Sequence, residues 1–244
     1  MFNFLLTGRE SRAHYLTMVK NDPATSKGEQ TRELIFTTAL ELFRENGFDA
    51  TTMQEVSNRA QVAKSAAYYY FPSKEAIIQA YYEAVQAEQE RLCTEAFAKT
   101  DDLKKRLHVA MQSKFDLAQY DRRLLGVVFR YTGEPTHPLS CLGEGTAEIR
   151  RRATEIFHQA LSVARLPKDL EQLLPLALWS LQMGLLVMFL YDTSADQKRT
   201  RQLASGSIDF TVRLMALAKL PILKPVRTRL LTLLREAGLL PELR

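Results

Sequence analysis

Residues 51–75 read TTMQEVSNRAQVAKSAAYYYFPSKE, and the architecture of the N-terminal part of the chain follows from this stretch. Glu55 lies three residues after Thr52, which is the spacing of a capping box, where each side chain bonds the other residue's backbone N–H. This spacing predicts a short helix that runs from Met53 to about Ala60.

A brief turn follows at 61–63, and a second short helix is expected over 64–70. Pro72 ends this helix, because a proline disfavours the α conformation in the residue before it. Upstream, apolar residues recur at helical spacing over 32–46. Two short helices joined by a tight turn, behind a longer supporting helix, describe a helix-turn-helix, whose second helix enters the major groove of DNA.

The supporting helix has clear signals at both ends. Ser26 and Glu29 have the spacing of a capping box before it. Gly47 suits the left-handed residue that follows a helix. Downstream, Ser73 is expected to cap a long helix.

The segment that would face DNA has a suitable composition. No acidic residue lies between Glu55 and Glu75, while three basic residues do, and a surface that faces phosphates must avoid carboxylates. Small residues let a helix approach base edges, while lysine and tyrosine can bond bases or phosphates. Free N–H groups at a helix N-terminus also suit a phosphate. The expected DNA contacts are Thr51, Thr52, Lys64, Ser65, Ala66, Tyr68, Tyr69, Tyr70 and Lys74.

Three consecutive tyrosines allow either a DNA-facing cluster or a core cluster. Successive helical residues point about 100° apart, so the three cannot all lie in the core. We expect Tyr68 and Tyr69 to be exposed and Phe71 to be buried, while both environments remain open for Tyr70.

Many residues at fixed spacing within 31–78 carry a family resemblance. They are Ala39, Phe43, Gly47, Phe48, Thr51, Thr52, Ala60, Val62, Tyr68, Tyr69, Phe71, Ser73, Lys74 and Glu75. Over this stretch the chain closely resembles the DNA-binding domain of the tetracycline-repressor (TetR) family. The resemblance implies phosphate contacts from Tyr68, Tyr69 and Lys74, contacts at the start of the second helix from Thr51 and Thr52, and base reading by Lys64, Ser65 and Ala66.

The chain departs from the family pattern at three positions. Gln61 occupies the turn position usually held by Gly, where a left-handed backbone would cost about 1 kcal/mol. Ala63 replaces the usual Ser or Thr cap, a loss of about 1 kcal/mol. Tyr70 stands where the family often has His. These departures bear on the tilt of the recognition helix.

Helical spacing continues through the rest of the chain, and no strand alternation is sustained. The predicted fold class is therefore all-α, with an N-terminal three-helix helix-turn-helix DNA-binding domain and a larger C-terminal helical effector-binding and dimerisation domain. The expected divisions are a flexible N-terminal extension over 1–26, the DNA-binding domain over 27–75, the helical body over 76–220, and a C-terminal amphipathic helix over 221–244 that packs its leucines on the body and turns its arginines to water. Ser194 and Gln197 predict one more capping box.

The resemblance also implies a homodimer whose body binds a small effector that lowers DNA affinity. Two recognition helices must lie ~34 Å apart to enter successive major grooves, so the double-stranded operator is expected to be pseudo-palindromic. The helices over 170–191 and 195–219 are the expected dimer contact. The run 173–191 approaches the ~20 apolar residues that span a bilayer, but its internal Pro175 and Gln182 favour a helix buried in protein, with no membrane partner.

An effector site needs polar groups among large apolar ones. Methionine and aromatic side chains adapt to varied ligands, and an inward arginine would suit an anionic group. The expected pocket residues are Met111, Phe115, Phe129, Arg130, Tyr131, Trp179 and Met183, each of which ordinary core packing would also explain. The effector itself is expected to be a small apolar or amphipathic molecule.

Composition and motifs exclude other classes of function. The net charge is +5, yet 27–75 sums to −1 and most of the excess lies in the two tails, so charge alone does not indicate a nucleic-acid partner. Two cysteines fit a reducing, cytoplasmic location. Nucleotide-binding, protease and hydrolase motifs are absent, and the histidines lack metal spacing, so we expect no catalytic residues, metal or cofactor. The alternatives are an activator or a protein-controlled regulator of the same fold and, more distantly, a helical membrane-associated adaptor.

Overall fold

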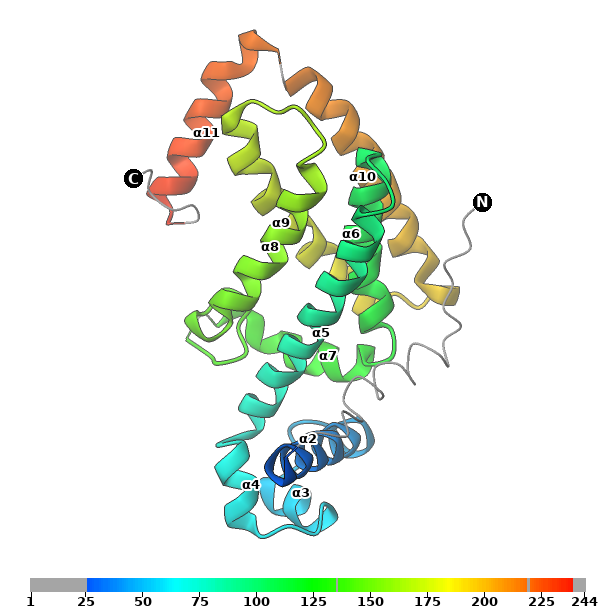
Figure 1. Cartoon of the computed structure of the whole chain (residues 1–244), viewed down its shortest axis with the longest axis vertical. Helices are drawn as coiled ribbons and strands as arrows, with labels where there is room; N and C mark the ends of the chain where they lie inside the picture. Colours follow the sequence, from blue (N-terminus) through cyan, green and yellow to red (C-terminus); the bar gives the residue numbers. More distant parts are fainter. Residues whose placement is uncertain (1–25, 135, 219, 239–244) are drawn as a thin grey trace. The chain divides into compact units, whose positions relative to one another are not determined.

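The computed structural model describes residues 26–134, 136–218 and 220–238, and within these ranges the chain is all-α (Figure 1). The predicted N-terminal extension and the last residues of the C-terminal segment lie outside the described ranges. The helices are α2 (Lys27–Asn46), α3 (Met53–Arg59), α4 (Lys64–Tyr70), α5 (Lys74–Phe97), α6 (Leu103–Ala118), α7 (Arg122–Val128), α8 (Ala147–Leu161), α9 (Lys168–Tyr191), α10 (Lys198–Ala218) and α11 (Lys224–Glu236).

The helices group into two compact units. One, called here the head unit, comprises the described residues up to Val85 together with those of Leu117–Ala147. The other, the body unit, comprises Gln86–Asp116 and the described residues from Glu148 onward. This grouping differs from a division at residue 75, because the first part of α5, together with α7 and the loop after it, clusters with the helix-turn-helix.

Local signals shape the head unit as the sequence predicts. The capping boxes at the starts of α2 and α3 are both formed. Gly47 follows α2 with a φ of 91°, and Gln61 takes a left-handed φ of 54° in the turn before α4. Ala63 precedes α4 without a side-chain cap, so the start of the recognition helix lacks the hydrogen bond that Ser or Thr would supply.

Aromatic residues fill the core of the head unit. Phe43 meets Phe48 edge-on at 5.2 Å between ring centroids, which folds the chain back after α2. Phe36 stacks on Phe71 at 6.2 Å, and both rings are buried. These contacts tie the end of α4 to the middle of α2 and thereby fix the direction of the recognition helix.

A buried carboxylate joins α7 to the helix-turn-helix. Asp121 accepts hydrogen bonds from Arg44 Nε at 2.6 Å and from the Tyr81 hydroxyl at 3.0 Å. Its side chain is 5% exposed, so water offers it little alternative solvation. The pairing therefore links α2, α5 and α7 within the head unit.

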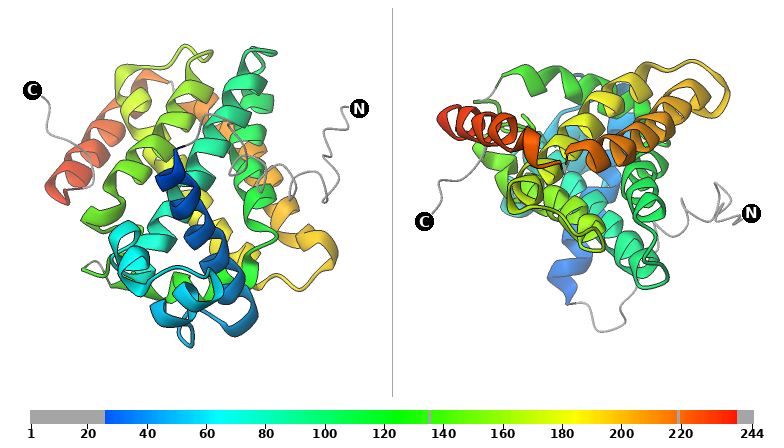
Figure 2. Two further views of the ribbon diagram at one scale, coloured as in Figure 1. Left: turned by 60° about the horizontal axis from the view of Figure 1, so that its bottom comes forward. Right: turned by 90° about the horizontal axis from the view of Figure 1, so that it is seen from above.

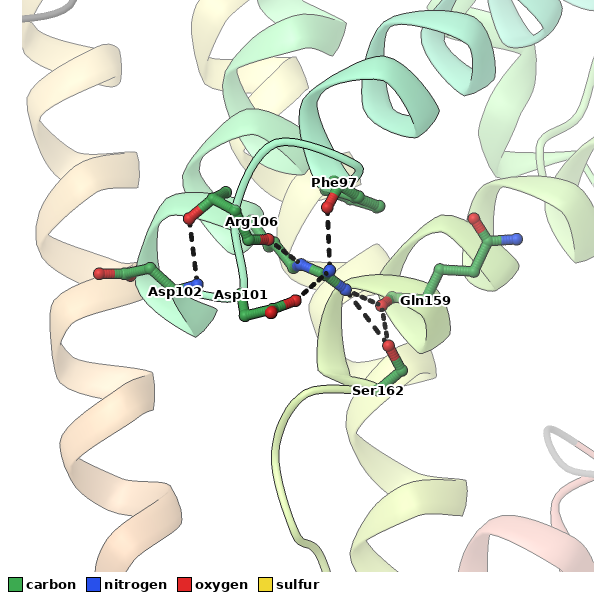
Figure 3. Close-up of polar contacts among 7 residues, drawn as sticks. Phe97, Asp101, Asp102, Arg106, Gln159 and Ser162 are labelled. Atoms are coloured by element: carbon green, nitrogen blue, oxygen red, sulfur yellow. Dashed lines mark hydrogen bonds and ion pairs between the residues drawn. The ribbon is translucent and has the colours of Figure 1, made fainter.

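In the body unit, one guanidinium joins the ends of three helices (Figure 3). Arg106, near the start of α6, donates to the carbonyl oxygens of Phe97 and Thr100 at the end of α5, at 2.9 and 2.7 Å. It also reaches Gln159 O and Ser162 Oγ at the end of α8, at 3.4 and 3.3 Å. A cation at two helix C-termini satisfies carbonyl groups that lack partners within their helices and opposes their partial negative charge.

The capping box predicted at Ser194 and Gln197 is wrong. Gln197 has a φ of 53°, which excludes the helical geometry that a capping box requires. Two residues instead cap the start of α10. Asp192 Oδ2 accepts from both the backbone N–H and the hydroxyl of Thr200. Ser194 Oγ accepts from the Arg199 N–H at 3.1 Å.

Helix α9 packs against both α10 and α11 (Figure 2). It is the one helix in the described ranges that is long and apolar enough to cross a membrane, by length and composition only. Helix α11 is fixed to it by Arg227, whose Nε lies 2.6 Å from Asp169 Oδ2. Arg227 is buried, whereas Leu230 and Leu233 remain partly exposed, so the expected arrangement of inward leucines and outward arginines is only partly found.

Candidate nucleic-acid interface

Helix α4 presents an exposed face of small, basic and aromatic residues. Lys64 and Ser65 are exposed at its start, and Ala66 is half-buried. Tyr68 and Tyr69 are 44% and 82% exposed, as predicted. A helix with this face can approach base edges at its N-terminal end and donate from tyrosine hydroxyls to phosphates.

Packing on the opposite side of α4 explains why this face points outward. Ala67 and Phe71 are buried against the other helices of the head unit. Tyr70 is half-buried, and its hydroxyl lies close to Gly28. A Cβ atom at position 28 would lie 3.3 Å from the Tyr70 hydroxyl oxygen. Tyr70 therefore takes an intermediate position, with its ring edge-on to Tyr69 at 5.1 Å.

Lys64 carries the free cation of this face. Among the described residues it makes no ion pair, and its Nζ lies 6.0 Å from the centroid of the Tyr68 ring. Arg59, by contrast, pairs with Glu45 at 2.8 Å on the surface. A cation without a carboxylate partner can neutralise a phosphate without first breaking an ion pair.

The two threonines before α3 have different environments. Thr52 is exposed, and its hydroxyl takes part in the capping box with Glu55. Thr51 is fully buried, and its hydroxyl donates to Gly47 O at 2.8 Å. DNA contacts are predicted from both threonines, and a contact from the Thr51 hydroxyl would compete with its bond to Gly47 O.

Lys74 also bonds within the head unit. Its Nζ donates to Phe48 O at 2.7 Å and to Asp49 O at 3.3 Å, and it lies 4.7 Å from the centroid of the Phe48 ring. The lysine thus holds the turn between α2 and α3 in place. The expected phosphate contact from Lys74 would compete with these bonds.

Asp49 holds the turn between α2 and α3 through side-chain contacts that the sequence did not predict. It accepts hydrogen bonds from the Tyr131 hydroxyl at 3.0 Å and from Arg130 Nη2 at 2.6 Å. The bond from Tyr131, followed by the charge and hydrogen bond of Arg130, lowers the pKa of the Asp49 carboxyl. The Tyr131 ring in turn stacks on His137 at 4.1 Å. These partners are 81 and 82 residues away along the chain, so no local pattern could reveal them.

The residues expected to form an effector pocket divide between the two units. Phe129, Arg130 and Tyr131 lie in the head unit, in a short 3-10 turn after α7, where Arg130 and Tyr131 bind Asp49. The others lie on α6 and α9 of the body unit, and they are Met111, Phe115, Trp179 and Met183. Phe115 is fully buried and stacks on Phe189 at 4.9 Å, Met111 and Trp179 are buried, and Met183 is half-buried.

Two family models match the chain. Residues 35–81 match the model described as bacterial regulatory proteins of the tetR family, and residues 106–228 match the tetracyclin repressor-like C-terminal domain. The first match contains α3, α4 and the turn between them. The second covers half of the chain and extends from α6 into α11.

Curated relatives are similar over parts of their length. The chain is 42% identical over 50 residues to the uncharacterized HTH-type transcriptional regulator YuxN of Bacillus subtilis, covering 20% of this chain and 17% of the relative. It is 29% identical over 112 residues to the HTH-type transcriptional activator FasR of Mycolicibacterium smegmatis, covering 44% of this chain and 50% of the relative. The chain thus spans half or less of these relatives.

Solved structures share the fold at low sequence identity. The transcriptional regulator FadR from Bacillus subtilis, crystallised in complex with stearoyl-CoA, has a TM-score of 0.56 at 18% identity, covering 72% of this chain and 96% of that one. A TetR/AcrR-family regulator from Thermobifida fusca has a TM-score of 0.52 at 20% identity, covering 72% of this chain and 95% of that one. Each of these two matches covers more of this chain than either unit contains, so each includes residues of both units.

Proposed function

The chain belongs to the TetR family of bacterial transcriptional regulators, and on that basis we propose that it is a homodimeric repressor released from its operator by a small-molecule effector. The DNA-binding, helix-turn-helix part of this description follows from the family itself. The observation that carries the proposal is the exposed face of α4, where Lys64 lacks an ion-pair partner among the described residues and Tyr69 is 82% exposed.

We assign the DNA contacts to the residues that point outward, and they are Thr52, Lys64, Ser65, Ala66, Tyr68, Tyr69 and Tyr70. Lys64 and the small residues after it suit base edges, while the tyrosine hydroxyls suit phosphates. Thr51 and Lys74 support the interface from within, because their polar groups bind backbone carbonyls of the turn between α2 and α3. Lys74 acts on DNA through the position of that turn.

A homodimer would present two such faces to a pseudo-palindromic operator. Recognition helices that enter successive major grooves must lie about 34 Å apart, which requires a stable contact between two copies. Helices α9 and α10 carry exposed apolar residues at helical spacing that suit this contact. They are Met188, Tyr191, Phe210, Leu214 and Leu217. Burying such residues against a second copy would remove apolar surface from water.

The dimer proposal has a direct test. Phe210→Glu with Leu217→Glu should convert the dimer to a monomer in light scattering, because two carboxylates would be buried in the contact. Leu142→Glu, which changes an equally exposed leucine of the head unit, should leave the mass unchanged. A dimer that persists in the double variant would contradict the contact through α10.

The effector is proposed to bind the body unit near Met111 and Phe115. The related FadR from Bacillus subtilis was crystallised with stearoyl-CoA. Acyl-CoA thioesters are therefore sensible first compounds among apolar or amphipathic candidates. A ligand can release DNA only by binding the DNA-free conformation more tightly than the DNA-bound one.

Activation instead of repression is the second candidate, and one observation favours it. The relative that matches over 112 residues is a transcriptional activator. A regulator controlled by a protein partner would use the same fold. A reporter gene behind the operator separates the outcomes, because deletion of a repressor raises expression and deletion of an activator lowers it.

The central experiment measures binding to DNA upstream of the protein's own gene. Binding should weaken steeply with salt because phosphate contacts release counterions. Lys64→Ala should weaken binding about 5- to 100-fold and reduce the salt slope by about one. Arg59→Ala is the matched control, because Arg59 already pairs with Glu45. Absence of any site at low salt would overturn the proposal.

We place this activity in the cytoplasm, where the DNA lies, and assign the chain no catalytic residue, metal, cofactor or membrane partner. Family members and structural neighbours are regulators. Contacts of α9 with α10 and α11, together with a dimer contact, account for its apolar composition without a bilayer. The apolar length of α9 therefore does not require a membrane-associated adaptor.

A further inference from the structure

A buried lysine lies between α5 and α6 in the body unit. Lys114 is 8% exposed, and within the described part of the chain its Nζ donates one hydrogen bond, to Gln86 Oε1 at 3.1 Å. Burial lowers the pKa of its ammonium group to about 8, so the side chain is still charged at pH 7. A buried cation with a neutral amide as its partner costs stability.

Nearby charged groups do not neutralise this lysine. Glu90 is already paired with Arg152 at 2.6 Å, and both of these side chains reach the surface. Gln86 separates them from Lys114, because its Nε2 donates to Glu90 Oε1 at 3.2 Å while its Oε1 accepts from the lysine. The charge of Glu90 raises the pKa of Lys114 and that of Arg152 lowers it, so the two opposing charges leave burial as the main influence on the lysine. Cys93 lies close to the lysine, and burial raises the pKa of its thiol to about 11, so it stays neutral.

Two glutamine side chains, one from α5 and one from α9, bond to α6 one turn before Lys114. Gln89 and Gln182 are each 1% exposed, and both donate from Nε2 to the carbonyl oxygen of Ala110, at 2.9 and 2.8 Å. Among the described residues, the Oε1 atoms of both glutamines accept no hydrogen bond. Gln89 also reaches Ser113, the neighbour of Lys114, at 3.3 Å. Lys114 of α6, Gln89 of α5 and Gln182 of α9 thus supply one ammonium and two buried acceptors around residues 110–114 of α6.

The surroundings of this cluster are apolar. Met111 and Phe115, on α6, are fully buried, and Phe115 stacks on Phe189 of α9. Buried polar groups with unmet hydrogen bonds amid apolar side chains are the composition of a small-molecule site. These groups are of the chemical types that pair with a charged end, a donor group and an apolar body of one ligand.

We propose that Lys114 anchors the negatively charged group of an amphipathic effector, while Gln89 and Gln182 accept hydrogen bonds from a donor on the same molecule. The inference rests on the proposed effector-binding function and adds the chemical class of the ligand and the residue that selects it. A carboxylate or phosphate at Lys114 would replace the neutral amide with a charge-assisted hydrogen bond. The ligand's apolar part would lie towards Met111 and Phe115.

The test compares probes with the same alkyl chain and different end groups. Dodecanoate, dodecanol and dodecyltrimethylammonium are titrated below their micelle concentrations into the full-length protein by calorimetry at pH 7. Wild type should bind dodecanoate at least tenfold more tightly than either other probe. Lys114→Met should bind dodecanoate no more tightly than dodecanol, and Lys114→Arg should retain the preference.

Two controls distinguish a variant that has lost the ligand contact of Lys114 from a variant that has lost its folded structure. Lys104→Met removes an exposed lysine of the same helix and should keep the full preference for dodecanoate. Lys114→Met should melt no lower than wild type, because it removes an unneutralised buried charge. A preference that survives Lys114→Met, or wild type that does not bind dodecanoate preferentially, would overturn the proposal.

Operator binding is measured separately with and without dodecanoate. If the anion preference depends on Lys114 but dodecanoate leaves DNA affinity unchanged, the anchor stands and coupling of this site to DNA release fails. If DNA affinity falls without a preference at Lys114, effector control stands and the assignment of the anchor fails. The two proposals can thus fail independently.

Discussion

The head and body units differ in how completely some of their buried polar groups are paired. In the head unit, Asp121 and Thr51 are buried and fully engaged with protein partners, whereas the groups suited to DNA stand on the surface of α4. In the body unit, Lys114 and two glutamine oxygens are buried with hydrogen-bonding capacity left over. A unit that binds a polyanion from outside needs its free groups exposed, and one that encloses a small molecule needs them inside.

The comparison has an exception in the head unit. Glu33 on α2 is half-buried, and its Oε1 has no hydrogen-bond partner among the described residues. Burial raises the pKa of this carboxyl to about 7. Buried groups of the head unit that hold its helices together are therefore paired within the protein, whereas Glu33 is not.

The largest expected effect comes from removing the engaged carboxylate of the head unit. Asp121→Ala leaves Arg44 and Tyr81 without their acceptor and should lower the free energy of unfolding by about 3 kcal/mol, in the range for breaking a buried pair. Urea denaturation measures it. Glu45→Ala, which breaks an exposed pair with Arg59, should cost less than about 0.5 kcal/mol. Equal costs would mean that burial does not distinguish the two pairs.

The next effect should have the opposite sign and concerns the body unit. Lys114→Met should raise the free energy of unfolding at pH 7 by about 2 kcal/mol, since it removes a charge that burial disfavours. The folded-state pKa of Lys114 is lowered, so its penalty is full below about pH 8 and disappears as the pH rises towards the unfolded value. The difference in free energy of unfolding between Lys114→Met and wild type should therefore shrink between pH 8 and about 10.4. A constant difference across this range would show that folding does not lower the pKa of Lys114 and that burial does not disfavour its charge.

A smaller effect distinguishes two lysines of the head unit. Lys74→Ala should lower the free energy of unfolding by about 1 kcal/mol because it frees the carbonyls of Phe48 and Asp49. It should weaken binding to all DNA sequences alike with little change in salt slope. Lys64→Ala should instead leave stability unchanged and lower the salt slope. The same slope change for both variants would show that Lys74 leaves its internal partners and binds a phosphate.

The smallest effect concerns the exception, Glu33. Its folded-state pKa is raised, so stability from this group is present below about pH 4.5 and is lost as the pH rises to about 7. Glu33→Gln removes the charge and should raise the free energy of unfolding at pH 8 by about 1 kcal/mol, with no gain at pH 4. Thermal unfolding at both pH values measures it. Glu41→Gln, an exposed change on the same helix, should have no effect at either pH.

The sequence predicted the head unit well because its signals are local. Capping boxes, Gly47 and Pro72 act within a few residues of themselves, and they placed α2, α3 and α4. The capping box at Ser194 is not formed because Gln197 has a left-handed φ. Ser194 Oγ and Asp192 Oδ2 each accept from a backbone N–H in the first turn of α10. Local patterns are reliable where one residue supplies the cap, and less so where two residues share it.

Pairings between residues far apart in the chain could not be predicted from the sequence. Arg130 and Tyr131 have the composition of a ligand site, yet they bind Asp49 more than 80 residues away. The sequence does not indicate that Lys114 is buried, because lysines are seldom buried. Its environment depends on Gln86 on α5, which only the packing of α5 on α6 reveals. The expected pocket therefore includes four residues of the body unit and does not include the buried polar groups of Lys114, Gln89 and Gln182.

The division of the chain inside α5 has a consequence for how such proteins recombine. The head unit is built from two separate stretches of sequence, and Asp121 of the second stretch holds Arg44 and Tyr81 of the first. A single genetic crossover at residue 75 would therefore join a helix-turn-helix to a foreign Tyr81 and a foreign Asp121. Exchange of DNA specificity between relatives, in evolution or in the laboratory, should succeed more often by changing the surface of α4 than by transplanting the first third of the gene.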